Sequence, residues 1–169
     1  AILKSDNLNF LFDTSPDLRS QLLNNKIDKI DSIFYSHMHA DQTHGINDMR
    51  AFFINKKKPI NVYADRTTSI HLKKTFNYCF VQKNSLYPPT LKLNKLKKNF
   101  VFYDNKNKIF IKPIKVKHGD IFSICYVINK KLAYISDVSS INKKDYKYFK
   151  NLDWIILDCL WYKYNPSHL

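Results

Sequence analysis

Histidine is concentrated in one short segment of this chain. Residues 36–45 read SHMHADQTHG and hold three of the six histidines of the protein, together with one carboxylate. They follow residues 30–35, IDSIFY, whose β-branched and aromatic side chains predict a strand. A loop that leaves a strand can turn several side chains toward one point, and imidazole and carboxylate groups suit zinc, manganese or iron. We interpret the segment as part of a metal site, and a polar surface loop with incidental histidines is the weaker alternative.

Other polar residues can supply the remaining ligands. His118 follows a strand predicted at residues 109–116, and Asp137 follows one predicted at residues 131–136. Taken alone, a histidine or aspartate after a strand is more typical of a turn or a cap. The glycines strengthen the case, because the chain has only two and each directly follows a histidine, at positions 45 and 119. In a chain so poor in glycine, we expect these residues where the backbone needs a positive φ or a close approach.

Strand-like and helix-like segments alternate along the chain, without an internal repeat, a low-complexity tract or a linker. We predict strands at residues 1–6, 8–13, 30–35, 60–64, 100–103, 109–116, 121–129, 131–136 and 154–158, the last of them buried, and helices at 15–23, 45–54, 67–78 and 143–150. This order favours an α/β sandwich with sheets inside and helices outside. We therefore predict one domain over residues 1–169.

The composition bounds the class of protein. Because 44% of the residues are hydrophobic and 15% aromatic, the chain can bury a core and is not a disordered tail. No apolar run is long enough to span a bilayer and residues 1–10 do not resemble a signal peptide, so we expect a cytoplasmic protein without a membrane partner. The net charge of +14 suggests anionic partners, although a lysine-rich solvated face, typical of an AT-rich genome, explains it equally well.

The three cysteines lie far apart in the sequence, at Cys79, Cys125 and Cys159. They form neither a C-x-x-C pair nor an even set for disulfides. We expect buried free thiols rather than metal ligands or nucleophiles.

The histidine segment and three further motifs resemble those of a known family. The segment SHMHADQ resembles the His-x-His-x-Asp-His signature of the metallo-β-lactamase-fold hydrolases. Together with FDTSPD at 12–17, HGINDMR at 44–50 and SDVS at 136–139, it resembles the branch of the phosphoribosyl cyclic phosphodiesterases, relatives of tRNase Z. The resemblance implies an αββα four-layer sandwich with a two-metal site at the sheet edge. It also implies hydrolysis of a phosphodiester by a metal-bound hydroxide.

The same resemblance assigns roles to individual residues. It implies that the first metal is held by His37, His39 and His118, that Asp41 holds the second, and that Asp137 bridges the two. The ions would be zinc or manganese. Asp13, after the second predicted strand, matches the acid that supports the histidine loop from behind and orients its ligands.

Two departures from the family pattern affect the expected site. Position 42 is glutamine where the signature has histidine, so the second metal loses a nitrogen donor and should bind more weakly or be a harder ion such as manganese. His44 is available nearby, but we do not assign it as a replacement. The chain also stops at Leu169, before the strand that carries the last histidine ligand of the family, and a first strand with its glycine-rich turn is missing. We therefore expect a domain truncated at both ends.

The last residues of the chain suggest a general acid. Asp158 ends a predicted strand and His168 follows ten residues later, and the pair resembles the acid and histidine that protonate the leaving oxygen in tRNase Z. A histidine oriented by a carboxylate suits that role, although a histidine near a chain end is often only solvated. Asp158, His168 and, through the second metal, Asp41 are the predicted catalytic residues.

Three functions remain open from the sequence. The favoured one is a metal-dependent phosphodiesterase acting on a small phosphate ester, cyclic esters included. The second is an RNA nuclease like tRNase Z, which we rank lower because the sequence shows no glycine- and proline-rich arm to grip tRNA. The third is a non-catalytic, metal-stabilised protein that binds anions and whose second metal site has decayed, as Gln42 suggests. A homodimer is compatible with each of them.

Overall fold

The computed structural model describes residues 1–81 and 88–169. These residues form two compact units, residues 1–96 and residues 97–169. The prediction of a single domain over residues 1–169 stays a prediction. None of the helices in the described part of the chain has the length and apolar character needed to cross a membrane.

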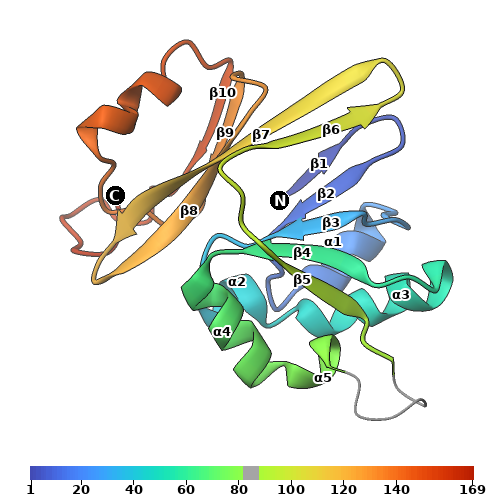
Figure 1. The fold of residues 1–169 in the computed structure, drawn as a ribbon. Coiled ribbons are helices and arrows are strands. Elements are labelled where there is room, and N and C mark those ends of the chain that lie inside the picture. Colours follow the sequence, from blue (N-terminus) through green and yellow to red (C-terminus); the bar gives the residue numbers. More distant parts are fainter. Residues whose placement is uncertain (82–87) are drawn as a thin grey trace. The chain divides into compact units, whose positions relative to one another are not determined.

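The first unit is built on a five-stranded sheet with the strand order β1-β2-β3-β4-β5 (Figure 1). Its strands are β1 (Ile2–Lys4), β2 (Asn9–Phe12), β3 (Ser32–Phe34), β4 (Ile60–Ala64) and β5 (Leu91–Lys95). The strands β1 and β2, predicted at residues 1–6 and 8–13, form an antiparallel pair, and the other neighbours are parallel. Parallel neighbours require crossover connections, which here carry helices.

Helices cover one face of this sheet (Figure 1). They are α1 (Leu18–Asn24), α2 (Ala40–Thr43), the 3-10 helix η1 (Ile46–Asp48), α3 (Met49–Lys56), α4 (Arg66–Thr75) and α5 (Asn77–Phe80). On β4 the buried residues alternate as Ile60, Val62 and Ala64, so one face of the strand packs into the core beneath the helices. The core also takes Leu22 from α1 and Leu72 from α4.

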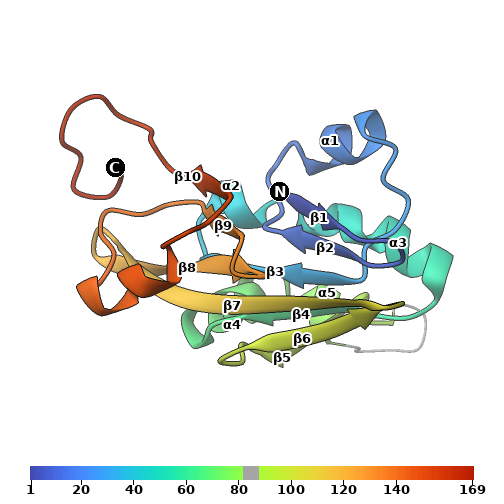
Figure 2. The ribbon, with the colours of Figure 1, turned by 90° about the horizontal axis from the view of Figure 1, so that it is seen from above.

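The second unit is a five-stranded sheet with the order β10-β9-β8-β7-β6 (Figure 2). Its strands are β6 (Phe100–Asp104), β7 (Asn107–His118), β8 (Ile121–Ile128), β9 (Leu132–Ile135) and β10 (Trp154–Leu157). All neighbours are antiparallel except β9 and β10. The 3-10 helix η2 (Lys143–Tyr148) belongs to the segment that packs against a core containing Val116, Cys125 and Ile135.

The structure departs from the predicted elements chiefly in four places; in addition, α2 was not predicted, and the helix predicted at 45–54 begins as the 3-10 helix η1. The predicted helix at 67–78 is two helices, because Phe76 leaves the helical conformation with φ −118° and ψ 39°. The helix at 143–150 is a 3-10 helix over Lys143–Tyr148. Strand β5 was not predicted, since its sequence, LKLNK, has little of the β-branched and aromatic character that marks a strand.

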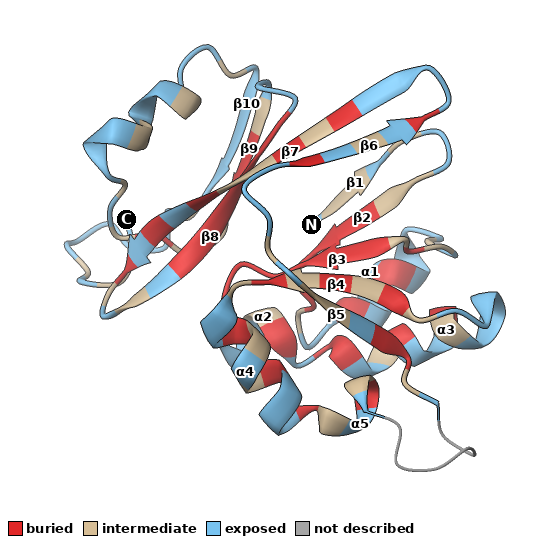
Figure 3. Ribbon diagram, in the orientation of Figure 1, coloured by how far each residue is buried: buried red, intermediate tan, exposed pale blue. Residues whose placement is uncertain are grey.

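The fourth difference concerns β10, which we predicted as a buried strand. Its side chains are exposed, with Trp154 at 74% and Ile155 at 48% of their full exposure (Figure 3). The strand is at the edge of its sheet and pairs with β9 alone among the described strands. An edge position explains why an apolar sequence that is typical of an inner strand stays accessible.

The turns of the chain use few glycines. Seven described residues other than glycine have a positive φ: Asp13, Lys26, Lys57, Asn105, Asn129, Lys130 and Asn151. Two of them form the turn between β8 and β9, with φ of 52° at Asn129 and 58° at Lys130. Positive φ at both central residues is the pattern of a type I′ hairpin turn.

The cysteine prediction holds for two of the three residues. Cys79 and Cys125 are buried free thiols, whereas Cys159 is a free thiol exposed just after β10. Burial raises the pKa of Cys79 to about 11 and that of Cys125 to about 12. At pH 8 both buried thiols are therefore almost entirely protonated and unreactive.

We expect a thiol reagent such as Ellman's reagent to modify one cysteine rapidly in the native protein at pH 8 and all three after denaturation. Cys159→Ser should remove the rapid phase, because the thiolates of the two buried residues are scarce and shielded. Cys125→Ser is the matched control and should leave the rapid phase intact. Rapid modification of two thiols per native chain would contradict the burial described above.

Candidate metal centre

The histidine loop, residues 36–45, leaves β3 in an extended conformation and then turns into a short helix. His39 is the last extended residue, with φ −62° and ψ 157°, and α2 begins directly after it. The His39 carbonyl accepts hydrogen bonds from the Gln42 backbone N–H at 3.1 Å and from the Thr43 hydroxyl at 2.9 Å. These bonds fix where the extended segment ends and therefore where the imidazole of His39 stands.

The side chains of His37 and His39 face each other. Nε2 of His37 lies 2.9 Å from Nδ1 of His39, and the two rings meet edge to face with their centroids 4.5 Å apart. His37 is buried and His39 is exposed. The two residues thus lie on the same side of an extended segment, as their spacing predicts, with His37 in the interior and His39 at the surface.

A buried carboxylate holds His37 in one tautomer. Oδ1 of Asp13 accepts hydrogen bonds from the Ser36 backbone N–H at 2.7 Å and from the Ser36 hydroxyl at 3.0 Å. Because the hydroxyl gives its single hydrogen to Asp13, it must accept at its 3.0 Å contact with Nδ1 of His37. The imidazole proton therefore sits on Nδ1, and Nε2 carries the lone pair that a metal ligand needs.

The backbone around Asp13 ties β2 to the histidine loop. Asp13 takes the left-handed conformation, with φ 60°, and its N–H donates to the Phe34 carbonyl at 3.0 Å. Thr14 donates to the Gln42 carbonyl at 2.7 Å, and Gly45 donates to the Thr14 carbonyl at 2.9 Å. A Cβ on Gly45 would stand 2.0 Å from the carbonyl oxygen of Ser15, so this glycine permits a close approach, as predicted.

The remaining polar residues of the loop face a different set of neighbours. The exposed carboxylate of Asp41 accepts a hydrogen bond from Nε2 of Gln42 at 2.7 Å. His44 is exposed, and its Nδ1 lies 3.3 Å from the Thr43 hydroxyl. Within the described part of the first unit, neither Asp41 nor His44 joins His37 and His39 in a group with donor atoms within 4.8 Å of one another.

In the second unit, His118 ends β7 beside Asp137. Nδ1 of His118 lies 2.6 Å from the Ser167 carbonyl oxygen, which can only accept, so Nδ1 carries a proton here too. Its Nε2 lies 3.5 Å from Oδ2 of Asp137. Gly119 follows with φ +55°, and a Cβ there would meet the Ser167 hydroxyl at 2.7 Å, so the second glycine also stands where the sequence predicts.

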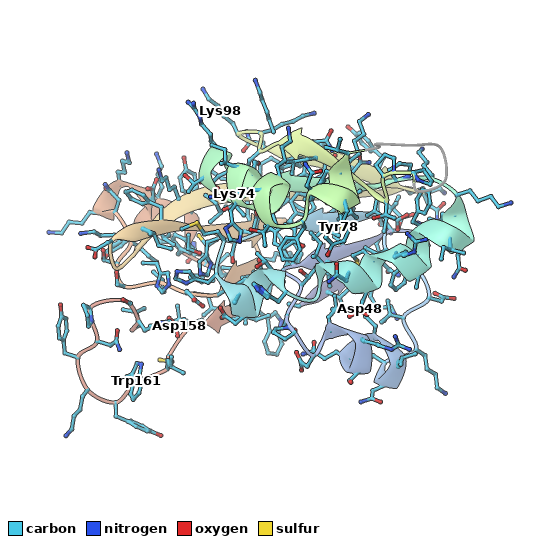
Figure 4. All side chains as sticks on the ribbon, turned by 90° about the horizontal axis from the view of Figure 1, so that it is seen from below. Asp48, Lys74, Tyr78, Lys98, Asp158 and Trp161 are labelled. Atoms are coloured by element: carbon cyan, nitrogen blue, oxygen red, sulfur yellow. The ribbon has the colours of Figure 1, made fainter. Side chains whose placement is uncertain are left out.

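Asp158 and His168 form a pair close to Asp137. Nδ1 of His168 lies 2.7 Å from Oδ2 of Asp158, which also accepts from the Val138 backbone N–H at 3.2 Å. Donor atoms of Asp137, Asp158 and His168 all lie within 4.8 Å of one another. Asp158 stands where β10 ends, and the loop that carries Trp161 follows it (Figure 4).

The turn that presents His168 is closed by Asn165. The side-chain oxygen of Asn165 accepts from the backbone N–H of Ser167 at 2.8 Å and from that of His168 at 3.3 Å. The same turn therefore places the Ser167 carbonyl against His118 and the His168 imidazole against Asp158. Sequence reasoning identified the histidines but missed Ser36, Asn165 and Ser167, since a hydroxyl, an amide and a carbonyl in a turn carry no specific signal.

The spacing of the donor atoms fits a metal ion. Two ligand atoms on a tetrahedral zinc ion at its usual bond lengths lie about 3.4 Å apart. The 3.5 Å between His118 and Asp137 matches this spacing and is too long for a good hydrogen bond. The 2.9 Å between His37 and His39 is shorter, so an ion would require the rings to part slightly and His39 to carry its proton on Nε2.

The comparison with protein families identifies the class. The family model of the beta-lactamase superfamily domain matches residues 8–169, which is nearly the whole chain and includes both units. The chain belongs to this superfamily, a family of metal-dependent hydrolases. Its two mixed sheets with flanking helices confirm the predicted α/β fold of the metallo-β-lactamase type.

Two curated proteins are similar in sequence. The octanoyltransferase of Porphyromonas gingivalis is 29% identical over 161 residues, which are 94% of this chain and 31% of that protein. The ribonuclease Z of Methanococcus maripaludis is 26% identical over 154 residues, which are 83% of this chain and 45% of that protein. The chain thus spans less than half the length of these relatives.

Solved structures show the same fold. A diphosphatase from the PhnP family has a TM-score of 0.85 and 29% identity, and the match covers 99% of this chain and 62% of that one. YhfI from Bacillus subtilis has a TM-score of 0.72 at 17% identity, covering 99% of this chain and 67% of that one. The short form of human tRNase Z has a TM-score of 0.66 at 17% identity, and the match covers 91% of this chain and 68% of that one. The last two show the fold alone.

We expect Asp13→Asn to lower the free energy of unfolding by about 1 kcal/mol, because hydrogen bonds to a charged acceptor contribute more than those to a neutral one. Asp13→Ala should cost more, since it leaves the buried Ser36 N–H without this acceptor and removes a side chain that tolerates positive φ. Urea denaturation followed by circular dichroism measures both. Asp17→Asn is the control, because that carboxylate also bonds to neighbouring side chains but is exposed. The urea midpoint of this variant should stay close to that of the wild type. Equal midpoints for Asp13→Ala and the wild type would contradict the support described here.

Proposed function

We propose that this protein is a metal-dependent phosphodiesterase of the cytoplasm that hydrolyses a small phosphate ester, cyclic esters included. The single observation that carries the proposal is the fixed tautomer of His37 and His118. In each of them a hydrogen-bond acceptor holds Nδ1, and Nε2 faces an atom of a neighbouring residue that could also bind a metal. Histidines oriented in this way are typical of metal ligands. The similarity to a diphosphatase of the PhnP family, at 29% identity, supports phosphate ester chemistry.

We assign the ligands as the family resemblance implies. His37, His39 and His118 would hold the first ion, Asp137 would bridge to a second, and Asp41 would hold that second ion. Bound there, zinc or manganese would activate water and stabilise the negative charge that develops on the phosphate. Asp13 would act by fixing the orientation of His37 through Ser36.

His168 is our candidate for the general acid. Asp158 accepts a hydrogen bond from Nδ1 of His168, which orients the imidazole and leaves Nε2 to deliver a proton to the leaving oxygen. The Val138 N–H and the Asn165 turn hold the two partners in place. His168 would thus carry the proton on Nε2 and release it from there to the leaving oxygen.

Gln42 supports a weaker second ion. Its amide replaces the imidazole of the family signature, and its Nε2 donates to the carboxylate of Asp41 that we assign to that ion. An amide oxygen is a poorer ligand for zinc than an imidazole, and it suits manganese better. We therefore expect one tightly bound and one weakly bound ion.

A second candidate function is an RNA nuclease. The 26% identity with a ribonuclease Z over 83% of this chain favours it. A third candidate is a non-catalytic protein that binds anions, for which Gln42 is the observation. Metal-dependent turnover separates the third candidate from the first two, and cleavage of RNA rather than of small esters separates the second from the first.

The first test is hydrolysis of bis-p-nitrophenyl phosphate by the full-length protein, stripped of metal and titrated separately with zinc and manganese. We expect turnover that depends on the metal and falls at least about a thousandfold in His39→Ala, since loss of a ligand removes the charge stabilisation that drives the reaction. His71→Ala is the matched control, because that histidine lies on α4 outside the proposed site, and it should keep its activity. A folded wild type without turnover with either metal would favour the non-catalytic candidate, and full activity in His39→Ala would refute the ligand assignment.

We also expect Gln42→His to raise the affinity of the second metal by an order of magnitude or more, because it restores a nitrogen donor. Isothermal titration of the metal-free protein with zinc measures both sites. Gln42→Asn is the control, since it keeps an amide and adds no imidazole, and its second site should stay weak. An unchanged titration curve in Gln42→His would count against a second ion beside Asp41.

A further inference from the structure

A groove of about 870 Å³ runs along the second half of β7 in the second unit. Five lysines line it, namely Lys98, Lys112, Lys115, Lys117 and Lys144, and we call it the lysine groove. Among its lining residues Asp145 is the one acid. The lysines are exposed, apart from the partly buried Lys112, and Lys98 stands out from the ribbon in Figure 4. The groove therefore concentrates positive charge along one strand.

The groove exists because β7 is longer than its neighbour. β6 pairs with β7 only as far as Ile111, whereas β7 continues to His118. Beyond Ile111 the strand is an edge on that side, until Lys117 bonds to Ser140. Pro113 lies in this stretch, and proline is tolerated in a strand mainly at such an edge. The open edge leaves room for a ligand beside the strand.

Aromatic rings contact two of the lysine side chains that line the groove. Nζ of Lys115 lies 3.8 Å from the ring centroid of Phe122, and Nζ of Lys112 lies 4.4 Å from that of Tyr148. Such contacts anchor the aliphatic stems and fix the positions of the ammonium groups along the groove. Phe122 is also 51% exposed, so part of its ring stays accessible to a planar ligand although the Lys115 ammonium lies over the ring.

These features fit an extended polyanion better than a small phosphate ester. Sites for small ligands are enclosed, mostly apolar and equipped with a few fixed polar groups. The lysine groove is an open strip with repeated positive charge and accessible aromatic rings. Backbones of single-stranded nucleic acids carry repeated negative charge and their bases stack on aromatic side chains, so both features have a partner in that class of ligand.

We propose that the lysine groove binds single-stranded RNA, with the phosphates on Lys112, Lys115 and Lys117 and a base on Phe122. The choice of RNA follows from the nuclease candidate of the preceding section, whose substrate class it specifies. Lys117 directly precedes His118 in β7, so the groove ends at the neighbour in sequence of the residue that we assign to the metal, and the two side chains leave the strand on opposite faces. The groove is separate from the ligand residues themselves, and binding does not require turnover.

The test is fluorescence anisotropy of a labelled 12-nucleotide oligouridylate with full-length protein in EDTA, at several salt concentrations. Because metal is absent, the result is independent of catalysis. The triple variant Lys112→Gln, Lys115→Gln, Lys117→Gln should bind at least about tenfold more weakly, and its plot of log affinity against log salt should be shallower by about 2, as expected for three lost phosphate contacts. Phe122→Ala should weaken binding about tenfold at an unchanged salt slope.

The control is the triple variant Lys106→Gln, Lys108→Gln, Lys130→Gln, which removes the same charge from the second unit outside the groove. It should bind nearly as well as the wild type. Equal losses in the two triple variants would overturn the proposal, since binding would then follow net charge alone. An RNA duplex of the same length is a further control, because stacking on Phe122 needs unpaired bases. The proposal would also be overturned if this duplex bound as tightly as the single strand and if Phe122→Ala left its affinity unchanged. Loss of phosphodiesterase activity with intact RNA binding would instead affect only the proposed function.

Discussion

The contact between the Asp13 carboxylate and Ser36 is the interaction on which the histidine loop depends. Asp13 is almost fully buried, and a buried carboxylate without partners would cost several kcal/mol. Its partners are the first backbone N–H and the first side chain of the loop, so satisfying the charge fixes how the chain leaves β3. The hydroxyl of Ser36 then passes this constraint to His37, whose ring could otherwise turn. One electrostatic requirement thus sets both the direction of the backbone and the tautomer of the His37 imidazole.

In the second unit, other groups orient the histidines. A backbone carbonyl, that of Ser167, holds Nδ1 of His118, and a carboxylate, that of Asp158, holds Nδ1 of His168. The acceptor is 49 residues from the histidine that it orients in the first case and 10 residues in the second. The chemistry of the imidazoles therefore depends on turns and caps as much as on the ligand residues, and a variant of Asn165 or Ser36 would act on histidines that it does not replace.

The sequence predicts residues that form a distinctive pattern, but not those whose role depends on contacts that form only in the folded chain. His37 and His39 could be predicted because three of the six histidines lie in one short segment, and His118 because it follows a predicted strand and precedes one of only two glycines. The strands of hydrophobic residues, such as Ile60–Ala64, follow directly from their alternation. By contrast, β5 depends on pairing with β4 rather than on its own residues, and the exposure of β10 depends on its place at the sheet edge. Long-range pairing and edge position are properties of the assembled sheet, which no local pattern contains.

The turns of this chain suggest where its stability could still increase. Positive φ is carried by asparagine, aspartate and lysine at seven described positions, while glycine occupies only one such position, Gly119. A side chain costs about 1–2 kcal/mol in the left-handed conformation, less for asparagine and aspartate than for lysine. The strain at Lys26, Lys57 and Lys130 is thus independent of the site and could be relieved without touching it, whereas at Asp13 the same strain is inseparable from the support of His37. Substitutions that stabilise this fold are therefore available at the lysines in its turns, but not at Asp13, which supports the histidine loop.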